Sequence, residues 1–364
     1  MAKRIIQQPH VRGNIPQTDI QDAVKTVVSN RKKIMNTYDK KYLDLCNTIL
    51  DEGVLKENRT GVNTIATTGL SIRHNMAEGF PLLTTKKMAF KSIRVELEGF
   101  LNGITSKSWY KERGCNIWNE WCNPQEVPYG KDAATKAAMA EEDDLGRIYG
   151  AQWRDWRYNK SDVDLYKDYL AANLEKYRND DGSQYTLHEF KDKLEIDETF
   201  FSVFGIQEHS IDQLQGILNT LIADPNDRRM ICSAWAPHDL DKMALPPCHF
   251  AWQTIVVGDR LDLVWNQRSC DVFLGLGFNV ASYALLLHLL AKHANLKEGI
   301  LTGHFGDIHI YENHIDQIRN QSEREPFNLP TIETDYPGFL HWTHKDTKLI
   351  GYKCHDKIYG EVAV

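Results

Sequence analysis

Residues 250–269, FAWQTIVVGDRLDLVWNQRS, constrain the fold most, because they form two apolar runs separated by Gly258 and Asp259. A Gly-Asp pair between two such runs predicts a β-hairpin. The segment Ala281–Leu296, ASYALLLHLLAKHANL, follows closely and is largely apolar along its whole length. A helix with apolar side chains on nearly all sides has to be buried. We therefore expect a hairpin and a core helix in the second half of the chain.

Composition and charge exclude several classes of protein. The chain has 364 residues, 42% hydrophobic and 26% charged, which is ordinary for a soluble globular enzyme of one large or two smaller domains. Its net charge of -7 argues against a protein that coats nucleic acid, although a local basic pocket for a phosphorylated small molecule is compatible with it. Because no apolar run reaches about 18 residues and the start resembles no signal peptide, we expect no membrane partner.

The seven cysteines form no CxxC pair. An odd number of cysteines without metal-ligand spacing indicates reduced thiols, with no disulfide framework and no metal site. We therefore expect a cytoplasmic protein.

Local patterns predict several elements in the first part of the chain. A helix is expected from about Tyr38 to a stop at Gly53, since apolar residues recur there at helical spacing. TIATTGLSIRHNM, residues 64–76, alternates like one strand, and its glycine interruption predicts a bulge. FKSIRVELEGFL, Phe90–Leu101, has the pattern of an amphipathic helix despite Gly99.

Changes in composition indicate how the chain is organised. Residues 1–37 are polar and mixed, and we interpret them as an N-terminal extension. Residues 38–364 are expected to form one catalytic domain with insertions at about 124–143 and 159–208. The second insertion is rich in charge, its stretch LYKDYLAANLEKY predicts a helix, and we interpret the insertion as a solvated accessory helix pair.

Cys248 is the first candidate for a functional residue, because in the stretch LPPCH two prolines precede it and His249 follows it. An isolated cysteine is more often a small buried hydrophobe than a nucleophile. Four other segments, however, concentrate polar residues, and their arginines fit a phosphate dianion because guanidinium groups bind phosphate oxygens in pairs. These segments supply Arg59; Arg228 and Arg229; Gln267, Arg268, Ser269, Asp271 and Asn279; and His309 with Tyr311.

With these residues in place, the sequence resembles the thymidylate synthases over nearly all of residues 38–364, apart from the two insertions. The matching stretches are ENRTG, GFPLLTTKK, NIWNEW, LGRIYGAQWR, DPNDRRMICSAW, LDKMALPPCH, QRSCDVFLGL, FNVASYALL, GDIHIYENH and the terminal EVAV. The resemblance implies an α/β (α+β) fold, in which a twisted, mainly antiparallel sheet lies at a homodimer interface with helices around it.

The resemblance also implies the chemistry. Cys248 would be the nucleophile that adds to C6 of the uracil ring of dUMP, so that C5 becomes nucleophilic. Glu96, Tyr149 and His249 would belong to the polar network that moves protons. Asn279 would recognise the base edge, since an amide can donate to O4 and accept from N3–H of uracil, which favours dUMP over dCMP.

The remaining positions carried by the resemblance bind the two small molecules. Arg59, Arg268 and Ser269 would hold the 5′-phosphate, and His309 and Tyr311 the 3′-hydroxyl. Arg228 and Arg229 would reach across from the second subunit of a homodimer. Gln267 and Asp271 complete the nucleotide set. The one-carbon donor would be 5,10-methylenetetrahydrofolate, contacted by Trp118, Trp121, Leu245, Asp271, Leu274, Gly275, Phe278, Val362 and Ala363.

Some residues depart from the family pattern around Glu96. Where these enzymes usually have Glu-Leu-Leu-Trp, this chain has Glu96-Leu97-Glu98-Gly99. Gly99 lies on nearly the same side of a helix as Glu96, so the missing indole opens a large space unless another segment fills it. Glu98 adds a charge, and a polar cavity of that size can hold water. Other departures are Asn119, Gly277, and Gly-Ile-Thr at residues 103–105.

These departures bear on the product. A methylene group on C5 that takes a hydride gives dTMP and dihydrofolate, whereas one that takes water gives 5-hydroxymethyl-dUMP. The polar space, together with the Glu-Leu-Glu shared with phage deoxycytidylate hydroxymethylases, narrowly favours 5-hydroxymethyl-dUMP. Trp118 and the terminal EVAV are intact and support the alternative, dTMP. A third hypothesis is an inactive dimer that binds nucleotide or RNA, which the acidic charge and the complete catalytic set disfavour.

Overall fold

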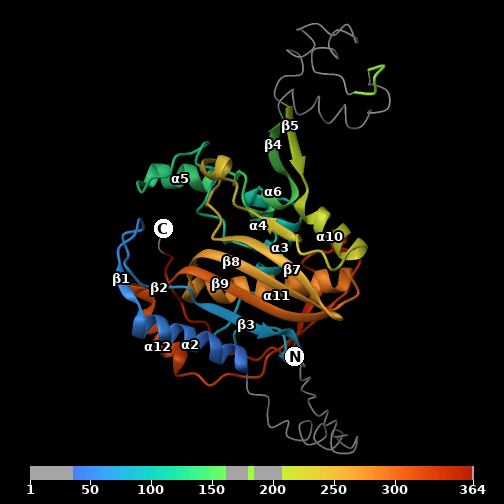
Figure 1. The fold of residues 1–364 in the computed structure, drawn as a ribbon. Coiled ribbons are helices and arrows are strands. Elements are labelled where there is room, and N and C mark those ends of the chain that lie inside the picture. Colours follow the sequence, from blue (N-terminus) through green and yellow to red (C-terminus); the bar gives the residue numbers. More distant parts are fainter. Residues whose placement is uncertain (1–35, 161–178, 184–206, 363–364) are drawn as a thin grey trace, which may run out of the picture.

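A seven-stranded sheet forms the centre of the computed structural model, which describes residues 36–160, 179–183 and 207–362. The strand order is β1-β2-β9-β8-β7-β6, and β3 also pairs with β9 (Figure 1). The β8–β9 pair is parallel and the other pairs are antiparallel. The strands are β1 Val54–Lys56, β2 Thr64–Thr68, β3 Ser71–Asn75, β6 Ile231–Ser233, β7 His249–Val257, β8 Arg260–Asp271 and β9 Lys297–Tyr311.

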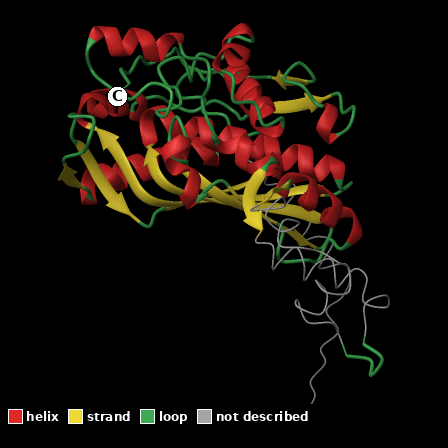
Figure 2. Cartoon of the chain, turned by 90° about the horizontal axis from the view of Figure 1, so that it is seen from above, coloured by secondary structure: helices red, strands yellow, loops and turns green. Residues whose placement is uncertain are grey.

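Most of the helices lie on one side of this twisted sheet, as Figure 2 shows. The described α-helices are α2 Thr37–Glu52, α3 Phe90–Leu101, α4 Lys107–Glu112, α5 Ala133–Glu141, α6 Tyr149–Arg154, α10 Gln213–Ala223, α11 Gly277–His293 and α12 Ile315–Ser322. Two further antiparallel ribbons are β4 Trp156–Lys160 with β5 Gln207–Ile211, and β10 Thr331–Thr334 with β11 Thr347–Ile350. The predicted fold class, a mixed α/β protein with a mainly antiparallel twisted sheet and surrounding helices, is confirmed.

The predicted hairpin is β7 and β8. Val257 pairs with Arg260, which leaves Gly258 and Asp259 as a two-residue turn, and Gly258 has a positive φ of 66° that favours glycine. Leu261, Leu263 and Trp265 alternate along β8 and are fully buried. This face of the sheet packs against α11, where the Tyr283 ring stacks on Trp265 with centroids 5.1 Å apart.

The core helix is displaced from the prediction Ala281–Leu296, since it ends at His293, three residues earlier than expected. It begins at Gly277, directly after a π-helical turn, Val272–Leu276. The Asp271 side chain caps this turn by accepting the N–H groups of Phe273 and Leu274. The whole Val272–His293 segment is long and apolar enough to cross a membrane by length and composition alone. Because 72% of its most apolar window is buried inside the protein, we interpret it as a core helix.

Three predictions near the N-terminal part of the domain can be compared with the structure. The helix expected to end at Gly53 is α2, and the predicted helix Phe90–Leu101 is α3. The prediction of a single strand with a glycine bulge over residues 64–76 was wrong. Gly69, with φ of 73°, separates two strands, β2 and β3, which pair with different parts of β9.

Of the two proposed insertions, the first includes α5, which lies away from the sheet, whereas only the two ends of the second and residues 179–183 are described (Figure 1). The first contains α5, which Asp132 caps by accepting the N–H group of Thr135 at 2.9 Å. The second leaves the body of the protein along β4 and returns along β5. The predicted helix over residues 165–177 and nearly all of the N-terminal extension lie outside the described residues.

Candidate active site

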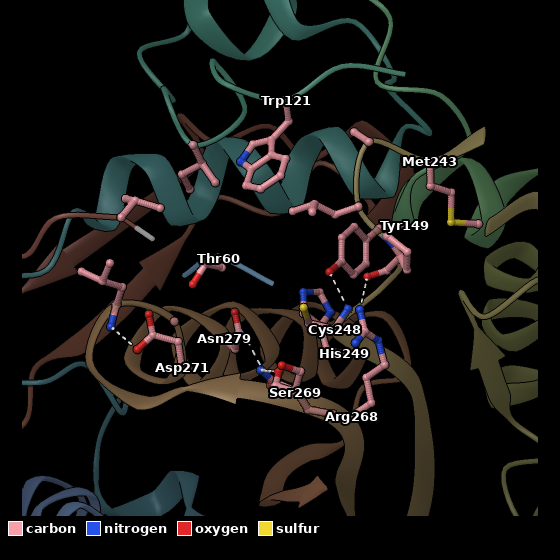
Figure 3. A pocket seen from close by; sticks show the side chains of 18 of the residues that line it. Thr60, Trp121, Tyr149, Met243, Cys248, His249, Arg268, Ser269, Asp271 and Asn279 are labelled. Atoms are coloured by element: carbon pink, nitrogen blue, oxygen red, sulfur yellow. Dashed lines mark hydrogen bonds between the residues drawn. The ribbon is translucent and has the colours of Figure 1, made fainter. Parts of the chain in front are cut away.

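A cavity of about 1180 Å³ opens between α3, the start of α11 and the ends of β8 and β9 (Figure 3). It collects most of the site residues expected from the sequence. Those that line it are Arg59, Glu96, Trp118, Trp121, Tyr149, Leu245, Cys248, His249, Gln267, Arg268, Ser269, Asp271, Leu274, Gly275, Phe278, Asn279, His309, Tyr311 and Val362. Ala363 lies outside the described residues.

The backbone around Cys248 is fixed on both sides. Its N–H group donates to the hydroxyl of Tyr149 at 2.9 Å, and its carbonyl accepts the N–H group of Arg268 at 2.8 Å. The Arg268 guanidinium also donates to the carbonyls of Pro246 and Pro247, at 2.8 and 3.0 Å. The two prolines therefore hold both the thiol and a cation that faces the cavity, which explains the rigid stretch before the cysteine.

Opposing influences set the acidity of the Cys248 thiol. Burial raises its pKa most, and the charges of Arg268 and Arg59 and a hydrogen bond with Tyr149 oppose that increase. A thiol that loses its proton here would have two guanidinium groups to stabilise the thiolate. The surroundings of Cys248 thus suit a nucleophile more than an inert buried cysteine.

A β-bulge follows the cysteine and orients His249. Two steps along β7, from His249 to Ala251, match one step along β8, so Phe250 is the extra residue. His249 Nδ1 lies 2.9 Å from the hydroxyl of Tyr283, and its ring stacks on Tyr149 with centroids 4.2 Å apart. Burial lowers the pKa of His249 to about 3, so the ring is neutral at physiological pH.

Glu96 lies on α3, with its side chain largely buried at one wall of the cavity. Burial raises the pKa of its carboxyl group to about 7, and the indole of Trp118 opposes this increase. A carboxyl group that titrates near neutrality can both accept and donate a proton under physiological conditions. Glu96 is therefore the described cavity residue best suited to proton transfer.

Asn279 is held by a short chain of amides. Its Nδ2 donates to Gln267 Oε1 at 3.0 Å, and Gln267 Nε2 donates to the carbonyl of Ser269 at 2.9 Å. Gln267 Oε1 also accepts the indole N–H group of Trp265 at 3.3 Å, so the Gln267 amide is held in place and orients Asn279. The Asn279 Oδ1 atom and one Nδ2 hydrogen stay available for one acceptor and one donor on a ligand.

His309 and Tyr311 come from the end of β9, where residues two apart lie on one face of a strand. Their rings meet edge to face with centroids 5.3 Å apart. His309 Nδ1 lies 2.7 Å from Asp307, which also forms an ion pair with Lys56 at 2.5 Å. The spacing of two predicted this arrangement correctly.

Arg228 and Arg229 do not line this cavity, in contrast to the other predicted arginines. They precede β6, and the side chain of Arg229 is 87% exposed and lies 2.7 Å from Asp227. Within this chain they contribute no charge to the site. Whether they serve a second subunit stays a prediction.

The cavity is large enough for two ligands. A single drug-sized ligand occupies a pocket of roughly 300–1,000 Å³. Opposite Cys248, the wall carries Trp121, with its ring facing the cavity in Figure 3. Together with Leu245, Leu274 and Phe278 it offers an apolar surface suited to a second, aromatic ligand beside a polar one.

The polar space expected beside Gly99 is not present. A Cβ atom built on Gly99 would lie 2.3 Å from Cε1 and Oη of Tyr110, so the Tyr110 ring fills this position. Glu98 faces elsewhere, because its Oε2 accepts the backbone N–H group of His344 at 2.7 Å and lies 2.6 Å from His344 Nδ1. Neither Gly99 nor Glu98 lines the cavity. The segment that fills the space is α4 rather than either insertion.

Several residues of the site were missed from the sequence. Tyr283 bonds His249, Trp235 lies under the Arg268 guanidinium at 5.5 Å, and Phe100 stacks on Tyr149 with centroids 4.9 Å apart. Asp307, which contacts His309, was also missed. Asp307 and Tyr283 could have been found by spacing, since Asp307 is two residues before His309 on a strand and Tyr283 is four after Asn279 on a helix. Trp235 and Phe100 had no such signal.

Comparison with known protein families agrees with this geometry. The sequence model described as thymidylate synthase matches residues 40–364, which include all the described cavity residues. The match covers most of the chain, from within α2 to the last residue. The chain therefore belongs to the thymidylate synthase family.

Proposed function

We propose that the protein converts dUMP to dTMP, with hydride completing the transfer. As a family member it is a one-carbon transferase that acts on dUMP, with 5,10-methylenetetrahydrofolate as the one-carbon donor. When bound, the folate supplies the one-carbon unit and, for a dTMP product, the hydride. The residues expected to hold it are Trp118, Trp121, Leu245, Asp271, Leu274, Gly275, Phe278, Val362 and Ala363.

In this proposal Cys248 attacks C6 of the uracil ring, and the new C–S bond makes C5 a carbon nucleophile. Arg268, with Arg59 and Ser269, binds the 5′-phosphate, and that contact sets the distance between ring and thiol. Asn279, oriented by Gln267, accepts from N3–H and donates to O4.

Glu96 is the group proposed to give and take the proton at the ring, since burial raises its pKa to about 7. His249 and Tyr149 would order the polar network around it. Burial lowers the pKa of His249 and raises that of Tyr149, so neither carries a charge near neutrality. His309 and Tyr311 would hold the 3′-hydroxyl group.

One observation supports dTMP over 5-hydroxymethyl-dUMP: the space beside Gly99 is filled. Tyr110 is fully buried there, and Trp118, which adjoins both Tyr110 and Phe100, is only 4% exposed. The route that would bring water to a C5 methylene group from this side is therefore closed by packed side chains.

Hydroxymethylation is the second candidate, and one atom favours it. Asn119, which stands where the family usually has aspartate, has a buried Oδ1 with no hydrogen-bond partner among the described residues. A buried acceptor of this kind is a natural site for a water molecule. Asn119 follows Trp118, which lines the cavity, so this water molecule would lie behind the cavity wall, within one residue of it.

The test is an incubation of the purified protein with dUMP and 5,10-methylenetetrahydrofolate, followed by mass analysis of the nucleotide. We expect dTMP together with an equal amount of dihydrofolate, seen as an absorbance increase. A product heavier than dTMP by one oxygen atom, formed without dihydrofolate, would establish the hydroxymethylase instead. Binding of dUMP without any turnover would favour the inactive dimer.

We also propose a homodimer in which Arg228 and Arg229 complete the phosphate site of the other subunit. Neither arginine lines the cavity of its own chain, and the side chain of Arg229 is 87% exposed although it pairs with Asp227. A guanidinium group this exposed can reach a phosphate on a neighbouring molecule.

A further inference from the structure

The fit between Tyr110 and Gly99 is too close to be incidental. Two ring carbons and the hydroxyl oxygen of Tyr110 occupy the position of a side chain on Gly99, at 2.3 to 2.4 Å from where its Cβ would be. No residue other than glycine fits at 99 without moving the ring, because real Cβ atoms do not approach neighbours so closely. Residue 99 and residue 110 therefore depend on each other.

A second contact fixes the ring in this place. The Tyr110 hydroxyl donates to the carbonyl of Ile104 at 3.0 Å, and the N–H group of Ile104 donates to the carbonyl of Gly99 at 2.9 Å. Ile104 is itself one of the departures from the family pattern. Gly99, Ile104 and Tyr110 thus form one connected unit that joins the end of α3 to α4.

Geometry places this unit near Glu96, because Glu96 precedes Gly99 by three residues on α3 and the two share one side of the helix. The Tyr110 ring also adjoins Trp118, with centroids 6.5 Å apart, and Trp118 is a hydrogen-bonding neighbour of Glu96. Burial raises the pKa of the Tyr110 hydroxyl most, and the Glu96 charge adds to that increase. Three further ionisable groups of described residues lie near Glu96. They come from the loop after α4, from α6 and from α11. They are Cys115, Tyr149 and Tyr283, and the Glu96 charge contributes to raising the pKa of each. None of them is a cation that would hold Glu96 ionised.

We propose that Tyr110 is a positioning residue for proton transfer: its ring closes the space beside Glu96 that Gly99 leaves open, and so keeps water from reaching that carboxyl group from the α4 side. This inference rests on the proposed function only in giving Glu96 the proton-transfer role. A buried carboxyl group without a cationic partner favours its protonated form, and access to water reverses that preference. Tyr110 would thereby set the pH at which Glu96 changes its protonation state.

The experiment replaces Tyr110 with alanine and follows Glu96 directly. The infrared band of the protonated Glu96 carboxyl group is identified as the band that disappears in Glu96→Gln. The intensity of this band is then measured as a function of pH. In Tyr110→Ala we expect the midpoint to fall from about 7 toward the ordinary value of 4.5, by roughly one unit or more. Adding Gly99→Trp to Tyr110→Ala refills the space and should return the midpoint toward the wild-type value.

Two controls separate positioning from simple loss of packing. Tyr38→Ala removes another fully buried tyrosine, which lies on α2 and does not line the cavity, so it should lower stability and leave the Glu96 midpoint unchanged. If Tyr110→Ala does not fold, Tyr110→Leu decides the question, with a smaller shift expected. A folded variant of either kind in which Glu96 titrates as in wild type overturns the proposal.

The outcome is independent of the product. If the wild-type protein makes 5-hydroxymethyl-dUMP, the proposed function fails, and the infrared titration still decides whether Tyr110 controls Glu96. If the wild type makes dTMP and the midpoint does not move, only the inference about Tyr110 fails.

Discussion

Glu98→Leu would restore the leucine usual in the family, and we predict that it strongly destabilises this protein. Glu98 and His344 are only 9% and 10% exposed, and the Glu98 carboxylate accepts from the His344 backbone at 2.7 Å and lies 2.6 Å from its ring. A hydrogen bond to a charged group contributes about 1.5–3 kcal/mol. Breaking a buried pair by removing one partner costs about 3–5 kcal/mol, which agrees with the loss of both contacts.

The assay is urea unfolding at one fixed protein concentration, with the free energy of unfolding compared between variants. Glu98→Gln keeps an acceptor without the charge and should lose about half as much, because charge-assisted hydrogen bonds are about twice as strong as neutral ones. Glu112→Leu on α4 is the matched control, since its side chain is 75% exposed and the change should stay within about 0.5 kcal/mol.

A loss smaller than about 1 kcal/mol in Glu98→Leu would refute this reasoning. It would mean that the contact with His344 is not maintained in solution, and that α3 is held by its apolar face alone. Equal losses for Glu98→Leu and Glu98→Gln would show that the charge, and not the geometry of the acceptor, carries the stabilisation.

Four further changes test the site. Cys248→Ser should abolish turnover while dUMP still binds in calorimetry, and retained activity would remove Cys248 from the nucleophile role. Asn279→Asp should shift kcat/KM from dUMP toward dCMP, because a carboxylate accepts from the cytosine amine and repels O4 of uracil; an unchanged ratio would contradict the base-edge assignment. Mixing Arg228→Ala with Cys248→Ser subunits should restore activity in verified heterodimers, and no recovery would mean that Arg228 serves its own subunit. His314 Nε2 donates to the carbonyl of Glu361 at 2.8 Å and thereby holds the neighbouring Val362, which is expected to contact the folate. His314→Ala should therefore raise KM for the folate and leave dUMP binding unchanged, as measured by steady-state kinetics and calorimetry.

What could be predicted from the sequence depended on local patterns. The hairpin around Gly258 and the helix Phe90–Leu101 follow from periodicity and turn chemistry within about 20 residues. His309 and Tyr311 share a face for the same reason. These features need no knowledge of what lies across the core.

What could not be predicted was the partner of each unusual residue. Gly99 indicates a missing side chain, but its sequence neighbourhood does not show that Tyr110 fills the space from another helix. Glu98 likewise gives no sign that its partner, His344, lies 246 residues away in the chain. A polar cavity and a packed wall were therefore equally compatible with the same four residues, and only the tertiary contacts distinguish them.

The ribbon of β4 and β5 has a consequence for how this enzyme could change over evolution. Its outermost pair joins Lys160 to Gln207, and paired Cα atoms of antiparallel strands lie only about 4.5–5.5 Å apart. The chain thus leaves and re-enters the body at almost one point, and no residue of either strand lines the cavity. A two-residue turn could bridge that gap. The length between these strands can therefore vary, shrink or be exchanged for another module while catalysis is left intact, which makes this the natural place for the protein to acquire new partners.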